Sequence, residues 1–343
     1  MSDIIKVENL VEVYPDGTRA VDDISFSVKE GEFFGFLGPN GAGKTTTIRV
    51  LTTLLEKTSG LVSIAGYDVE TNAKEIRRLI GVQSQYTIVD DDLTGRENLM
   101  LQGNLQRMRG AVLEQRVNEL LSLVGLSDVA DKKVVQYSAG MKRRLDLTSA
   151  LVHKPKLLFL DEPTIGLDPQ SRAAIWRYLE ELNKTQGVTI FLTTQYLDEA
   201  DKLCKRLSII DHGQLIISGS PAELKQQIGG DTIAVKLAER DSDGALKEKS
   251  RKIAGGIRGV TKVIDTDEGL ATIAQNAGQI IPDIVRAFDQ NRIPVVSVSF
   301  SSPSLDDVFL QHTGRRIRPE ELQKKPVYAF SKAPRRRRKI PFH

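Results

Sequence analysis

The chain has 343 residues, of which 40% are hydrophobic and 27% are charged, and these values are ordinary for a globular protein of one or two domains. No apolar run approaches the roughly 18 residues that span a bilayer, and the N-terminus lacks the features of a signal peptide. The single Cys204 excludes an internal disulfide. These features predict a protein of a reducing, cytoplasmic compartment.

Charge is unevenly distributed along the chain, whose net charge is +3. Residues 314–343 hold 11 of the 48 basic and 2 of the 45 acidic residues, so this segment carries +9 and the remainder −6. The mildly acidic remainder argues against a broad nucleic-acid-binding surface. The basic segment 315–343 has no periodicity, which predicts a disordered tail. Besides a merely solvated tail, a contact with anionic lipid is one hypothesis for it.

The first predicted elements are strands over residues 4–14, 22–28 and 33–37, followed by a phosphate-binding loop. Residues 38–45 read GPNGAGKT, the pattern G-x-x-x-x-G-K-S/T, and a helical pattern follows. The glycines let successive N–H groups point at phosphate oxygens, and the helix start adds its positive dipole end. Lys44 is expected to reach the β- and γ-phosphates of ATP and Thr45 to bind Mg²⁺. The predicted phosphate-binding residues are Gly38, Pro39, Asn40, Gly41, Ala42, Gly43, Lys44, Thr45 and Thr46.

A further strand is predicted over residues 61–65, and then residues 94–154 have helical patterns throughout. An all-helical insertion inside an α/β core is expected to form a subdomain. Its last helix begins at residues 137–141, which read YSAGM. The Ser138 hydroxyl and the N–H groups of this helix start offer contacts to a second phosphate.

Residues 157–163 read LLFLDEP, a buried strand that ends in two carboxylates. The carboxyl ends of parallel strands are where α/β sheets bind ligands. Asp161 is expected to hold Mg²⁺, and Glu162 to polarise the attacking water. Taken alone, the segment could also be a strand that ends in an ordinary acidic turn, but the preceding phosphate loop favours the catalytic interpretation.

Strands are then predicted over residues 189–194 and 206–218, the second with a hairpin turn at residues 211–213. After residue 229 the pattern changes to the order strand, helix, strand, strand, helix, strand. This order predicts a small ferredoxin-like α+β domain over residues 230–314, closed by a last helix.

The motifs GPNGAGKT, Gln85, YSAGM, LLFLDEP and GLDP, in this order and spacing, resemble the nucleotide-binding domain of ABC transporters over residues 4–225. The resemblance implies an ABC-type phosphate-loop core over residues 1–229 that includes the helical subdomain. It also implies an ATP-dependent head-to-tail dimer, in which each ATP lies between the Lys44 loop of one copy and the YSAGM helix of the other. The residues assigned by resemblance are Tyr14 to the adenine, Gln85 to Mg²⁺ and the helical subdomain, Ser138 and Gly140 to phosphate, and Asp168 to the loop that crosses between subunits.

Two departures from the family pattern bear on catalysis. YSAGM replaces the usual LSGGQ but keeps Ser138 and Gly140. Gln195 stands where the family usually has a histidine at the γ-phosphate, and an amide cannot exchange a proton near neutral pH. We therefore assign the general base to Glu162, γ-phosphate sensing to Gln195, and phosphate charge stabilisation to Lys44.

TTQY at residues 193–196 and LDDVFLQHTGR at 305–315 are similar to the daunorubicin-resistance type of ATPase subunit. This resemblance implies ATP hydrolysis that powers export of a drug-like or lipid-like substrate through a separate membrane-spanning permease, on the inner face of the membrane. The alternative is a soluble ABC-type ATPase that acts on ribosomes or nucleic acid. A phosphate-loop kinase is disfavoured by YSAGM and GLDP.

Overall fold

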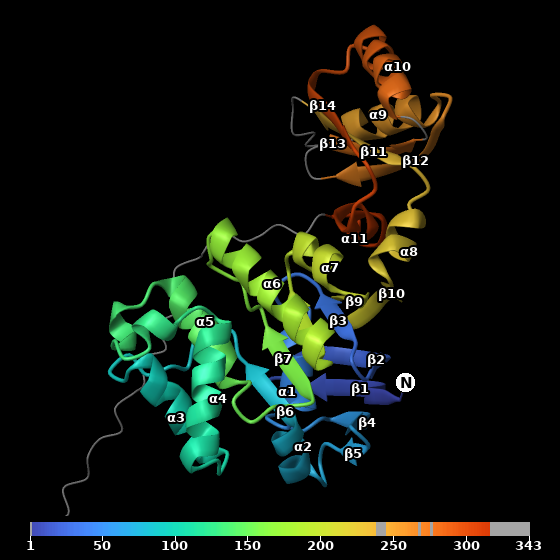
Figure 1. Cartoon of the computed structure of the whole chain (residues 1–343). Helices are drawn as coiled ribbons and strands as arrows, with labels where there is room; N and C mark the ends of the chain where they lie inside the picture. The colour runs from blue at the N-terminus through green and yellow to red at the C-terminus, as the bar shows by residue number, and fades with distance from the viewer. Residues whose placement is uncertain (1, 238–244, 267–268, 275–276, 316–343) are drawn as a thin grey trace, which may run out of the picture.

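The computed structural model describes residues 2–237, 245–266, 269–274 and 277–315. Figure 1 shows two groups of elements, a large one from β1 to α8 and a smaller one that holds β11 to β14 with α9 and α10. None of the helices in the described ranges combines the length and apolar character that a membrane crossing requires.

A six-stranded sheet in the order β10-β9-β3-β8-β7-β6 forms the centre of the large group. All neighbours are parallel except β10, which pairs antiparallel with β9. The strands are β3 (Phe33–Leu37), β6 (Ile80–Gln83), β7 (Leu157–Asp161), β8 (Thr189–Thr194), β9 (Arg206–Asp211) and β10 (Gln214–Gly219). Every residue of β3, β7 and β8 is buried, which explains their continuous apolar runs.

A second, antiparallel sheet in the order β2-β1-β4-β5 lies beside the first. Its strands are β1 (Asp3–Val13), β2 (Arg19–Lys29), β4 (Ser59–Ile64) and β5 (Tyr67–Asp68). The helices of the large group outside the insertion are α1 (Lys44–Leu51), α2 (Ala73–Leu79), α6 (Pro169–Gln186), α7 (Leu197–Leu203) and α8 (Pro221–Gln226).

Alternate residues of the central strands build two separate cores. Phe34 and Phe36 pack with Ile48 of α1 on the face toward the antiparallel sheet, whereas Phe33 and Leu37 belong to the core that includes α6 and the helical insertion. Because successive strand side chains point to opposite faces, the five-residue strand β3 contributes to both cores. This double burial fixes the strand that carries the phosphate loop.

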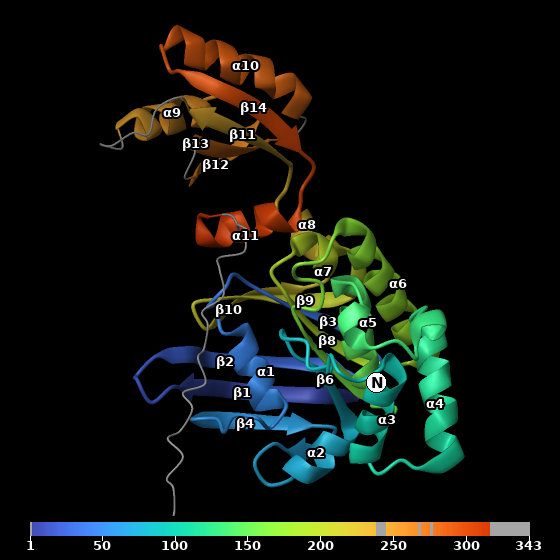
Figure 2. The same cartoon turned by 90° about the vertical axis from the view of Figure 1, so that its left-hand side faces the viewer.

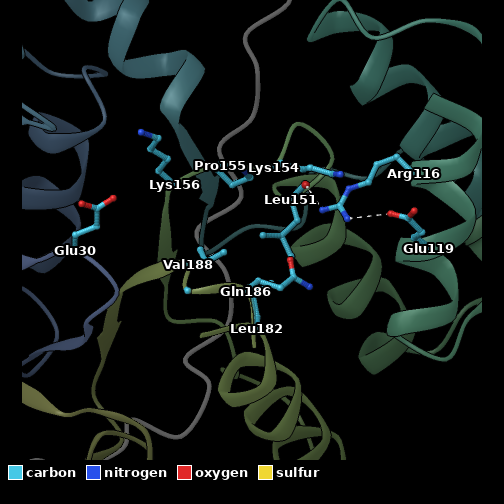
Figure 3. A pocket seen from close by; sticks show the side chains of 11 residues that line it. Glu30, Arg116, Glu119, Leu151, Lys154, Pro155, Lys156, Leu182, Gln186 and Val188 are labelled. Atoms are coloured by element: carbon cyan, nitrogen blue, oxygen red, sulfur yellow. Dashed lines mark hydrogen bonds and ion pairs between the residues drawn. The ribbon is translucent and has the colours of Figure 1, made fainter. Parts of the chain in front are cut away.

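The segment predicted as helical over residues 94–154 contains α3 (Gly95–Leu105), α4 (Gly110–Leu123) and α5 (Ala139–Ser149), with two short 3₁₀ turns between α4 and α5. Arg116 of α4 ties two parts of this insertion together, since its guanidinium donates to the carbonyl of Leu151, just after α5, at 2.9 Å. Figure 3 shows Arg116 beside a cavity of about 560 Å³ at the junction, where it also contacts Glu119.

The small group has the predicted element order: β11 (Asp231–Leu237), α9 (Ala245–Gly255), β12 (Val260–Thr266), β13 (Gly269–Ala274), α10 (Ala277–Gln290) and β14 (Val295–Ser301). Its sheet has the order β12-β13-β11-β14 with every pair antiparallel. Ile233, Leu270, Ile284 and Phe288 share its core. The ferredoxin-like fold expected from the sequence is therefore present.

Helix α11 (Leu305–Thr313) brings the chain back to the large group. Leu305, Val308 and Phe309 are buried in the same core as Leu224 of α8, and both views show α11 between the small sheet and helices α7 and α8 (Figures 1 and 2). Arg315 follows this helix, and the rest of the predicted basic tail lies outside the described residues.

Candidate nucleotide-binding site

A cavity of about 450 Å³ opens beside the phosphate loop. Its lining brings together strand ends and loops from across the large group, many of which the sequence had singled out. The lining residues are Tyr14, Thr18, Arg19, Ala20, Asn40, Gly41, Gly43, Lys44, Thr45, Thr46, Gln85, Glu162, His212 and Gly213.

The phosphate loop depends on glycine at positions 38 and 43. A Cβ atom at Gly38 would lie 2.3 Å from the Ile210 carbonyl oxygen, and one at Gly43 would lie 2.4 Å from the Ala20 carbonyl oxygen. Gly43 also has a φ of 108°, which side chains disfavour. The loop is thereby pressed against β9 and β2, and α1 begins at once with Lys44.

Lys44 is buried at the centre of the site, with 5% of its side chain exposed. Its ammonium donates to the carbonyls of Gly38 at 2.7 Å and Pro39 at 3.0 Å. It also forms an ion pair with Glu162 at 3.1 Å. The phosphate loop and the Glu162 carboxylate, 118 positions apart in the sequence, therefore meet at one cation.

Thr45 and Asp161, both expected at Mg²⁺, lie in direct contact. The Thr45 hydroxyl donates to Oδ2 of Asp161 at 3.0 Å, and the Thr193 hydroxyl donates to Oδ1 at 2.6 Å. Gln85 lines the same cavity. A hydroxyl, a carboxylate and an amide supply the oxygen ligands that Mg²⁺ prefers, so these residues fit the ion.

Glu162 combines a strained backbone conformation with a buried side chain. Its φ of 52° is left-handed, a conformation that costs free energy in residues other than glycine and clusters at functional sites. Burial raises the pKa of its carboxyl, although the neighbouring Lys44 ammonium opposes the shift. Its Oε2 atom is buried without a hydrogen-bond partner among the described residues. This oxygen is chemically suited to accept a proton.

Tyr14 and Gln195 flank these groups. The Tyr14 hydroxyl shares a hydrogen bond of 3.0 Å with the Thr46 hydroxyl, which ties the aromatic ring to the first turn of α1. Gln195 follows β8, the strand between β3 and β7, and only 4% of it is exposed. Gln195 therefore lies between the strand end that leads to the phosphate loop and the strand end that carries Asp161 and Glu162.

Ser138, Gly140 and Asp168 do not line the cavity. Ser138 caps α5 and accepts a hydrogen bond from the Met141 N–H at 3.2 Å. A Cβ atom at Gly140 would lie 2.7 Å from the Ser171 hydroxyl, which itself donates to Asp168 at 2.6 Å. These three residues form a separate cluster where α5 meets α6.

Arg143 is a residue that the sequence did not reveal. Its buried guanidinium joins α5 to the loop after β6 and to the end of β7, because it donates to backbone carbonyls of these segments; it also forms an ion pair with Asp146 of α5 at 3.5 Å. The acceptors are the carbonyls of Ser84, Gln85, Asp161, Glu162 and Pro163. No side-chain motif could signal such contacts.

The sequence did not assign five further residues of the cavity wall to the site. They are Thr18, Arg19, Ala20, His212 and Gly213. The turn at residues 211–213 was recognised as a hairpin, but nothing in its sequence placed it beside the phosphate loop. The Gly213 N–H donates to the Ala42 carbonyl at 3.0 Å, which shows that this hairpin is part of the site.

Comparisons with known proteins agree with this geometry. The family model for ABC transporters matches residues 21–165. The model for the C-terminal domain of DrrA1-3-like ATP-binding proteins matches residues 219–313. Together they cover the phosphate loop, the helical insertion and the small sheet.

Relatives match nearly the whole chain. The daunorubicin/doxorubicin resistance ATP-binding protein DrrA of Streptomyces peucetius is 41% identical over 90% of this chain and 92% of its own length. The Nod factor export ATP-binding protein I of Sinorhizobium fredii is 37% identical over 92% of this chain and 87% of its own.

A solved ATP-binding cassette, described as a dimer in a post-hydrolysis state with ADP and Pi, is 27% identical. It covers 63% of this chain and 98% of its own, with a TM-score of 0.58. The fold, the motifs and the relatives agree on a nucleotide-binding ATPase. The chain belongs to the ATP-binding subunits of ABC transporters, in the group of the daunorubicin-resistance proteins.

Proposed function

We propose that this chain hydrolyses ATP at the cavity beside Lys44 and that the hydrolysis powers export through a separate permease. The observation that carries the proposal is the meeting of Lys44, Thr45, Asp161 and Glu162 in one buried cluster. Each of these groups has a task in phosphoryl transfer, which depends on positioning and on stabilisation of charge.

Lys44 and the N–H groups of its loop bind the phosphates, and the Tyr14 ring stacks on the adenine. Thr45, Asp161 and Gln85 would hold Mg²⁺, which neutralises charge on the β- and γ-phosphates when bound. The Lys44 ammonium lies 3.1 Å from the Glu162 carboxylate. A bound γ-phosphate therefore competes with Glu162 for this ammonium.

The oxygen of the attacking water bonds to the γ-phosphorus while the bond between that phosphorus and the β–γ bridging oxygen breaks. Glu162 accepts the proton that the water loses. Its raised pKa makes it a better proton acceptor than an ordinary carboxylate. Gln195 donates a hydrogen bond to the γ-phosphate and transfers no proton.

A second copy of the chain completes the site in this proposal. Ser138, Gly140 and Asp168 lie outside the cavity, so they are free to face the phosphates bound by a partner. The helix start at Ser138 is exposed and presents N–H groups and a positive dipole end. The dimeric cassette among the similar structures supports this arrangement.

The permease contact is proposed at a groove between the core and the helical insertion. A cavity of about 300 Å³ there is lined by residues of α2, β6, α3 and α5 and by the segment that follows α1. Two apolar side chains at its rim stand open to solvent, Leu54 with 68% and Ile88 with 60% exposed. An amphipathic helix of the permease would cover them, and the chain would then lie on the cytoplasmic face of the membrane.

The transported substrate is proposed from the relatives. Their names include daunorubicin, doxorubicin and Nod factor. These names favour export of a drug-like or lipid-like compound over the alternative, an ATPase that acts on ribosomes or nucleic acid. The basic segment 315–343 would add affinity for anionic lipid at the membrane surface.

ATP turnover and ATP binding, measured on the same preparations, test the catalytic assignment. Glu162→Gln should lower turnover by about 100-fold or more and keep ATP binding. Lys44→Ala should weaken binding itself. A Glu162→Gln variant that turns over normally would remove Glu162 as the base.

A further inference from the structure

Arg315, which follows the small domain, contacts the hairpin whose turn lines the nucleotide cavity. Arg315 lies two residues after α11, and its Nη2 atom donates to Oδ1 and Oδ2 of Asp211 at 2.8 and 3.0 Å. The same nitrogen lies 3.0 Å from Nε2 of His212. Asp211 is the last residue of β9 and His212 begins the turn to β10, so one guanidinium joins the C-terminal unit to that hairpin.

This turn is part of the wall of the nucleotide site. His212 and Gly213 line the cavity, the Gly213 N–H donates to Ala42 in the phosphate loop, and the Asp22 N–H donates to the Gly213 carbonyl at 2.8 Å. His212 has a left-handed φ of 47°, which is unfavourable for a residue with a side chain. Contacts made to this turn therefore bear on the shape of the cavity wall.

Arg315 supplies two such contacts. The Asp211 carboxylate is 9% exposed, and a buried carboxylate without a cation is costly. A guanidinium can only donate hydrogen bonds, so Nε2 of His212 accepts and its imidazole carries the proton on Nδ1. Arg315 thus neutralises one side chain of the turn and fixes the tautomer of the next.

We propose that Arg315 is a positioning residue of the nucleotide site, which holds the turn at residues 211–213 and cancels the Asp211 charge near the phosphate loop. This inference rests on the proposed ATP binding. Without Arg315, Asp211 leaves an unpaired negative charge beside a loop that must receive a triphosphate, which weakens binding. Coupling is reciprocal, so bound nucleotide also strengthens the attachment of Arg315.

The test measures the affinity of the full chain for a fluorescent ATP analogue with Mg²⁺. Arg315→Ala should weaken binding about five-fold or more, with Arg315→Gln as a second variant that keeps a donor. The matched control is Arg286→Ala, which removes an arginine of α10 that is 74% exposed and pairs with Asp283. The control should bind as the wild type does.

A double variant isolates the effect of the Asp211 charge. In the Asp211→Asn background no carboxylate remains at position 211, so adding Arg315→Ala should cost little binding. A full additive loss in that background, or unchanged binding in Arg315→Ala, would overturn the inference while leaving the nucleotide site intact. If the wild type itself binds no nucleotide, the proposed function and this inference fail together.

Discussion

Arg143 is the residue that joins most parts of the catalytic centre. Its guanidinium is the common donor to the loop after β6 and to the carbonyls around Glu162. An arginine suits this task because its planar fork presents five donors, whereas lysine offers a single ammonium. Glu162 thus owes its strained position to a helix of the insertion, although the strand that carries it belongs to the core.

Arg143→Met should lower the free energy of unfolding by about 3 kcal/mol or more, because several buried carbonyls lose their donors. Arg143→Lys should recover little of this loss. The matched control is the neighbouring Arg144→Met, since Arg144 donates to a single carbonyl, that of Val124 at 2.6 Å. Urea unfolding checks both, and equal losses in the two variants would contradict the assignment.

The buried Glu162 carboxyl also makes stability depend on pH. Because burial raises its pKa above the ordinary value of 4.5, the folded state holds this proton at pH values where the unfolded state has lost it. Its contribution to stability therefore falls as pH rises above about 4.5. Glu162→Gln removes that dependence.

Melting temperatures of wild type and Glu162→Gln should accordingly diverge with pH, with the variant gaining relative to wild type between pH 5 and 8. The difference between the two proteins isolates this group from other titrations. A difference that stays constant or shrinks as pH rises would show that the carboxyl is not destabilised by burial.

At the scale of elements, the groove between the core and the helical insertion is the proposed permease contact. Leu54→Glu should reduce co-purification with the permease by about ten-fold, since a charge replaces an apolar contact, and should leave the ATPase activity of the isolated chain unchanged. Val112→Glu is the matched control, because Val112 is 70% exposed on α4 and outside the groove. Equal losses in both variants would argue against this docking surface.

Elements with strong periodicity or motif context could be predicted from the sequence, and elements defined by pairing could not. The buried runs of β3 and β7, the helices of the insertion and the order of the C-terminal domain were all expected. The strand β6, only Ile80–Gln83, was missed because its burial comes from pairing with β7. The residues of the site divide in the same way. Lys44 and Glu162 lie in sequence motifs and could be predicted, whereas Arg143 and His212 act through contacts that only the fold creates.

At the scale of the whole molecule, the proposed shared site requires that one chain carry two sets of nucleotide contacts that do not face each other. The Lys44 loop lines the cavity, and the cluster of Ser138, Gly140 and Asp168 lies where α5 meets α6. Helix α11 packs against the large group, and Arg315 after it contacts Asp211 at the hairpin of the cavity wall. A dimer that pairs unlike halves would give each ATP both sets of contacts.

The most direct test of this account is the solution mass of Glu162→Gln, measured by light scattering with and without MgATP. The shared site predicts a monomer without nucleotide and a dimer with it, and Ser138→Arg in the same background should prevent the dimer. A variant that binds ATP at saturation and keeps the mass of a monomer would contradict the central claim that two copies share the site.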